Sequence, residues 1–86
     1  MYENINEQVS VAVIFSKGSH KVRPFKVRWN NRDFEITAVD YQYKYKEGQS
    51  LIHVFSVTDG ISYFELQYDS ANLKWILGRI SDGEAH

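Results

Sequence analysis

The segment "HVFSVTDGISYFEL" (residues 53–66) decides the fold, because a turn signal separates two runs in which apolar and polar residues alternate. Alternation with a period of two places successive side chains on opposite faces of a strand. An Asp-Gly dipeptide between two such runs is a strong signal for a two-residue hairpin loop. A loop of that length pairs Phe55 with Phe64, on a face that is apolar apart from His53.

The segment that follows extends this hairpin into a sheet. A four-residue loop over residues 69–72 pairs Leu66 with Trp75 and continues the same aromatic face. The leucine and isoleucine spacing over residues 73–80 also fits an amphipathic helix, so a second interpretation stays open. The strand is favoured because its inward residues match those of the preceding hairpin.

The first part of the chain contains a second hairpin. The runs "PFKVRW" (residues 24–29) and "DFEITAV" (residues 33–39) both alternate, and asparagines lie between them. A two-residue loop at Asn30-Asn31 or Asn31-Arg32 is favourable, because asparagine tolerates positive φ. Either loop brings basic residues of the first run beside acidic residues of the second.

Another strand is expected before this hairpin. The run "VSVAVIFS" (residues 9–16) is apolar on both faces, as in a strand buried on both sides.

These runs predict an all-β fold, a small antiparallel meander of about six or seven strands closing into a barrel or a strongly curled sheet. A chain of 86 residues with 43% hydrophobic content fits one domain with one core. We expect this domain over residues 9–80, with flexible polar ends at residues 1–8 and 81–86.

The stretch "DYQYKYKEG" (residues 40–48) carries three tyrosines on one face of a strand. They are Tyr41, Tyr43 and Tyr45. A two-residue loop at Glu47-Gly48 would place them beside Ile52 and Val54, away from the aromatic core. A three-residue loop puts glycine at the left-handed position of a bulged hairpin, which costs less energy. We therefore expect the tyrosines to line the barrel and not to form a surface for stacking.

The composition argues against several functional classes. The chain has no cysteine, so disulfides, thiol catalysis and cysteine-based zinc sites are excluded. The net charge of −1 argues against binding to nucleic acid or to a membrane through bulk charge alone. No apolar run is long enough to span a bilayer. A cytoplasmic protein without a membrane partner or a cofactor is expected. His20, His53 and His86 are scattered, His53 is expected to be a core residue, and no catalytic residues are assigned.

Basic residues are concentrated between residues 17 and 32, where no acidic residue interrupts them. Six of the ten basic side chains lie there: Lys17, Lys21, Arg23, Lys26, Arg28 and Arg32. A positive surface near aromatic rings is typical of proteins that bind single-stranded nucleic acid. In that case Trp29 would be exposed for stacking. The competing interpretation is an ordinary solvated face paired with acids, with Trp29 and Trp75 both mostly buried.

The polar face of the central hairpin contains a row of apolar residues. They are Ile52, Val54, Tyr63, Ile76 and Ile80. Either residues 9–16 cover this row, or it is exposed and binds a protein partner or a second copy of the chain. The sequence therefore predicts a non-catalytic binding or interaction module, with nucleic-acid binding as the first alternative. A small-ligand-binding barrel or enzyme is the second, and it requires a pocket that reaches His53.

The layout from residues 9 to 80 resembles a family of small uncharacterised bacterial β domains. The resemblance is carried by "PFKVRW" (residues 24–29), "FEI" (residues 34–36), "HVFSV" (residues 53–57) and "LKWIL" (residues 73–77). These are packing residues, so the resemblance implies an all-β fold and a bacterial or phage source. It implies no activity and no site residues.

Overall fold

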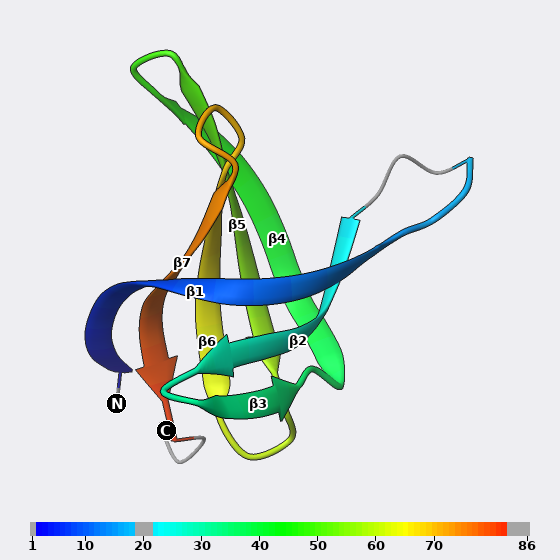
Figure 1. Ribbon diagram of the computed structural model, residues 1–86, viewed down its shortest axis with the longest axis vertical. Helices are drawn as coiled ribbons and strands as arrows, with labels where there is room; N and C mark the ends of the chain where they lie inside the picture. Colours follow the sequence, from blue (N-terminus) through cyan, green and yellow to red (C-terminus); the bar gives the residue numbers. More distant parts are fainter. Residues whose placement is uncertain (1, 19–21, 83–86) are drawn as a thin grey trace.

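The computed structural model describes residues 2–18 and 22–82, which form one antiparallel sheet of seven strands (Figure 1). The strands are β1 (Tyr2–Phe15), β2 (Val22–Trp29), β3 (Arg32–Glu35), β4 (Ala38–Glu47), β5 (Ser50–Thr58), β6 (Tyr63–Asp69) and β7 (Lys74–Ser81). Their order in the sheet is β3-β2-β1-β7-β6-β5-β4. The predicted all-β antiparallel meander is confirmed, and the helix considered for residues 73–80 is wrong because β7 occupies that segment.

Strand β1 joins the hairpin of β2 and β3 to the meander of β4 to β7, because it pairs with β7 through its first half and with β2 through its second half. Over the described residues no ladder joins β3 to β4, so the sheet is not closed into the predicted barrel. Two backbone hydrogen bonds guide the chain across this opening. The N–H of Ile36 donates to the carbonyl of Phe25 at 2.9 Å, and that of Thr37 donates to the carbonyl of Thr58 at 2.8 Å.

The sheet folds over on itself, so that β1, β2 and β3 cross in front of β4 to β7 (Figure 1). The bend coincides with a register shift in β1 between Asn4 and Glu7, where Asn6 has a φ of 54°. Extra residues in one strand bend it and increase its twist. Pairing with β7 begins at Tyr2, so residues expected to be a flexible end belong to β1.

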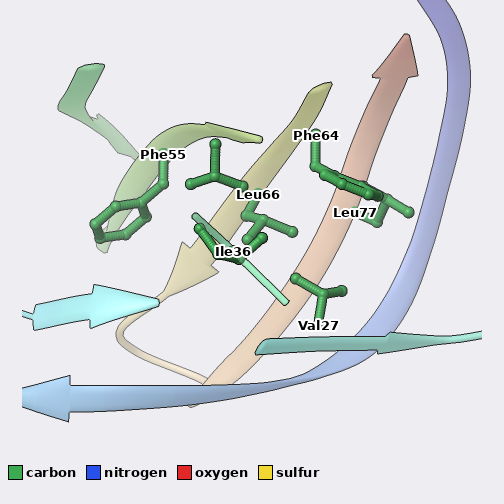
Figure 2. Packing of buried hydrophobic residues seen from close by; sticks show 7 residues of the cluster. Val27, Ile36, Phe55, Phe64, Leu66 and Leu77 are labelled. Atoms are coloured by element: carbon green, nitrogen blue, oxygen red, sulfur yellow. The ribbon is translucent and has the colours of Figure 1, made fainter. Parts of the chain in front are cut away.

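The core lies between these two layers of the folded sheet (Figure 2). One layer supplies Val27 and Ile36, and strands β5, β6 and β7 supply the rest: Phe55, Val57, Phe64, Leu66 and Leu77. Each such side chain stabilises the fold by about 1.5–3 kcal/mol when it is fully buried. We call the face of β4–β7 that carries these residues the inner face, and the opposite one the outer face.

The hairpin of β2 and β3 forms as predicted. Asn30 and Asn31 have φ values of 54° and 60°, and the two-residue loop pairs Trp29 with Arg32. Alternation along residues 24–29 places Phe25 on the same face as Val27 and Trp29, but Phe25 is exposed. A register shift opposite Ala12 and Val13 turns Pro24 inward in its place.

The registers on both sides of β6 differ from the prediction by two residues. Phe55 pairs with Leu66 and not with Phe64, and Leu66 pairs with Leu77 and not with Trp75. The first difference arises because the Asp59 carboxylate accepts hydrogen bonds from the N–H groups of Ile61 and Ser62, at 2.9 and 2.7 Å. These bonds hold a four-residue loop. Because a shift of two preserves the side-chain face, the predicted aromatic inner face still forms.

The loop before β7 contains a strained residue that tests this register. Leu73 has a φ of 55°, is 75% exposed, and donates its N–H to the carbonyl of Asp69 at 2.8 Å. A left-handed conformation costs a leucine about 1–2 kcal/mol, a penalty that glycine avoids. We expect Leu73→Gly to raise the free energy of unfolding by about 0.5–1 kcal/mol in urea titrations. This gain is the relieved strain minus the larger conformational entropy that glycine loses on folding. Leu73→Ala, which keeps the strain, is the control and should give no gain; equal effects of both variants would contradict the conformation.

Trp29 tests the packing between the two layers. Its ring lies against Phe34, with centroids 6.4 Å apart, and its indole N–H donates to the Glu7 carboxylate at 3.0 Å. We expect Trp29→Ala to lower the free energy of unfolding by about 3 kcal/mol, because a large aromatic ring leaves the edge of the core. Trp29→Phe, which loses only the exposed hydrogen bond and part of the ring, should cost about 1 kcal/mol. Unchanged stability of Trp29→Ala in the same urea titration would show that the ring is not part of the core.

Candidate interaction surface

The tyrosines of β4 lie on the outer face, contrary to the expectation that they line a barrel. The hairpin loop is Gly48-Gln49, so Glu47 pairs with Ser50 and Tyr45 pairs with Ile52. Positive φ occurs at Gly48, as in a type II′ turn, which takes glycine at its first central position. The register therefore differs from the predicted one by an odd number of residues, and an odd shift turns every side chain to the other face.

The three tyrosines form a row of exposed rings that we call the tyrosine ladder (Tyr41, Tyr43 and Tyr45). Their exposed fractions are 56%, 49% and 40%. The rings of Tyr41 and Tyr43 are stacked, with centroids 6.1 Å apart and planes 12° apart. The next pair, Tyr43 and Tyr45, is tilted, at 6.5 Å and 31°. The ladder thus presents ring edges and hydroxyl groups to solvent along one strand.

Two apolar residues of the predicted interface lie beside the ladder. Ile52 and Val54 have exposed fractions of 6% and 2%, so they are available to a partner only to a small extent. They are flanked by Tyr45 and Tyr43 on β4. Their role is to form a buried apolar base next to the ladder, which holds the tyrosines on a well-packed strand pair.

The other three residues of the predicted interface do not form one patch. Tyr63 is exposed and Ile76 is half-buried, and both lie on the outer face. Ile80 pairs with Phe64 and packs against the core on the inner face. The separation results from the register shift opposite Glu65 and Leu66, around Gly78, which reverses the side-chain alternation of β7.

Charged and polar groups tie the outer face together next to the ladder. Arg79 donates to the Glu65 carboxylate at 2.9 Å and lies over the ring of Tyr2, 4.5 Å from its centroid. A Cβ atom on Gly78 would lie 2.8 Å from Nε2 of Gln67, so the missing side chain leaves room for that amide. Partial burial, and then the charge of Glu47, raise the pKa of Tyr45 above its ordinary value.

The described basic residues of the predicted nucleic-acid site do not all lie on one face of the β2–β3 hairpin. Lys26 and Arg28 lie opposite Glu35 and Asp33, and Arg28 forms an ion pair with Asp33 at 3.1 Å. Arg32 turns the other way, with its guanidinium 4.9 Å from the ring centroid of Phe34. The rest of the set is exposed Lys17, exposed Arg23, and Lys21, which lies outside the described residues together with His20 and His86.

A cavity of about 160 Å³ opens on the inner face and reaches His53. It is lined by Val13, Phe15, Val22, His53, Phe55, Tyr68 and Trp75. The Trp75 ring lies 4.9 Å from that of Tyr68 and 5.5 Å from that of Phe55, by centroids. Sequence patterns do not reveal this cavity, because its lining comes from five strands that only the folded sheet brings together.

No metal site accompanies the cavity in the part of the chain that the structure describes, where no three histidine or carboxylate side chains group around a point that could hold an ion. That part of the chain also contains no helix long and apolar enough to cross a membrane. Comparisons of the chain with protein-family models, with curated proteins and with solved structures find no match.

Proposed function

We propose that this chain is a non-catalytic interaction module that binds a protein partner through the tyrosine ladder. The observation that carries the proposal is the row of three rings, each at least 40% exposed, on a strand at the end of the sheet. Tyrosine is enriched at protein interfaces, because it adds a large, stiff contact area and a hydroxyl group. In a single chain such a row leaves apolar ring surface in water, which a partner would remove.

The position of the ladder on an edge strand supports a protein partner. Strand β4 pairs with β5 on one side and is the last strand in the sheet order. The other side of an edge strand presents backbone N–H and C=O groups that can pair with an added strand. A partner there gains backbone hydrogen bonds and ring contacts together.

The basic stretch gives weaker support to the nucleic-acid alternative. The charge of Arg28 is partly neutralised by Asp33, and Arg32 lies on the opposite face of its hairpin. Of the two aromatic residues in this stretch, Trp29 packs against the core and is not free for stacking, whereas Phe25 is exposed.

The proposal predicts that capture of a partner depends on Tyr43. When the immobilised chain is incubated with an extract of its native cells, we expect Tyr43→Ser to lose a protein that the wild type retains. The matched control is Tyr63→Ser, which removes another exposed tyrosine from the same outer face but not from β4. Melting curves must first show that both variants are folded. Retention of the same proteins by wild type and Tyr43→Ser would contradict the proposal.

A second candidate function is the binding of a small aromatic molecule in the His53 cavity. Its volume of about 160 Å³ and apolar lining are suited to a single ring, since a dry cavity of about 150 Å³ holds benzene. The imidazole of His53 in the wall adds one polar group that could hydrogen-bond a ring substituent.

Phenol is a suitable probe for this second candidate, because the two tryptophans report on different places. We expect phenol to produce a saturable shift of the Trp75 indole N–H signal in NMR spectra, because Trp75 lines the cavity. The indole of Trp29, bonded to Glu7 outside the cavity, is the internal control and should not move. No saturable shift at Trp75, or equal shifts of both signals, would contradict binding in the cavity.

A further inference from the structure

We propose that the partner of the tyrosine ladder is a second copy of this chain, paired antiparallel along β4 with Tyr43 opposite Tyr43. This inference rests on the proposed function and specifies the partner. It joins two sheets edge to edge, so that the ladders of both copies form one continuous row. The side chains from Tyr41 to Tyr45 of β4 are self-complementary in this register.

The backbone of β4 is arranged for such pairing. The two-residue loop bonds Glu47 to Ser50, and hydrogen-bonded pairs alternate along an antiparallel ladder. The backbone groups of Tyr45 and Tyr43 therefore point toward β5. The backbone groups of Lys44 and Gln42 point to the other side of β4, where the sheet order places no strand. This side is the outer edge of the sheet in Figure 1.

Symmetry and charge then select the register. In a two-fold pair of this kind side chains of the same face meet, so the ladder of one copy meets that of the other. A pair centred on Lys44 places two lysines opposite each other, which is unfavourable. A pair centred on Tyr43 places Tyr45 opposite Tyr41 and Lys44 opposite Gln42, within the regular part of β4. It also brings Lys46 of each copy to the place where Asp40 of the other copy lies, at the β-bulge between Val39 and Tyr41.

Another register is centred on Gln42. It sets Lys44 near Asp40 but carries the pairing of Tyr45 past the β-bulge at Asp40 to Val39, which packs against the core on the inner face. The Tyr43-centred register pairs the whole ladder with itself and also brings each Lys46 to an Asp40, so it is the one we infer. Lysines on an edge strand normally prevent two sheet edges from pairing. In this register Asp40 of the second copy offsets the charge of each Lys46.

Charge reversal tests this register by sedimentation equilibrium of the full chain. We expect the wild type to form a reversible dimer, and Lys46→Glu and Asp40→Lys each to weaken it by about tenfold, since two like-charged pairs replace two attractive ones. Combining both changes in one chain should restore the dimer. Mixing the two single variants should also restore it, because each then supplies the charge that the other lacks.

Lys44→Glu is the matched control. In the inferred register Lys44 lies opposite Gln42, so the variant should dimerise nearly as the wild type does. Rescue of Lys44→Glu by Asp40→Lys would instead show the Gln42-centred register and overturn the inference. A wild type that stays monomeric at all concentrations, or a dimer unaffected by either reversal, also overturns it. If Tyr43→Ser still loses a captured protein in that case, the proposed function stands and only the identity of the partner is wrong.

Discussion

The pairing of β1 with both β2 and β7 is the constraint on which the rest of the structure depends. Without it, the hairpin of β2 and β3 would have no attachment to the four-stranded meander, and Val27 would have no layer to pack against. The bend that allows one strand to serve two partners is made by local register shifts, at Asn6 and opposite Ala12 and Val13. The core is therefore a consequence of how one strand curves.

Side-chain alternation predicted the strands and the inner face, because a period of two depends only on neighbouring residues. Registers were predicted less well, since they depend on loop hydrogen bonds such as those of Asp59 and on bulges such as that near Gly78. Errors of two residues left the aromatic core intact. The odd error at Gly48 reversed a whole strand and moved the tyrosines from the expected interior to the surface.

For the candidate sites too, the sequence revealed the residues but not their arrangement in space. The tyrosine row was visible in the sequence, but its exposure depended on a single loop. The basic cluster was equally visible, yet the fold divides it between two faces of a hairpin and pairs Arg28 with Asp33. The inward position of His53 was visible in the sequence, but the cavity that reaches it was not, because a concave surface requires residues distant in the chain.

The adjacency of Tyr2 and Ser81 in the ladder of β1 and β7 has a consequence for how the chain folds. This ladder joins residues that lie far apart in the sequence, so its formation closes a long loop that contains strands β2 to β6. The entropy of that closure must be lost before the contacts form, which slows folding. The meander of β4 to β7 contains only connections between consecutive strands, so its contacts cost less closure entropy than the ladder of β1 and β7.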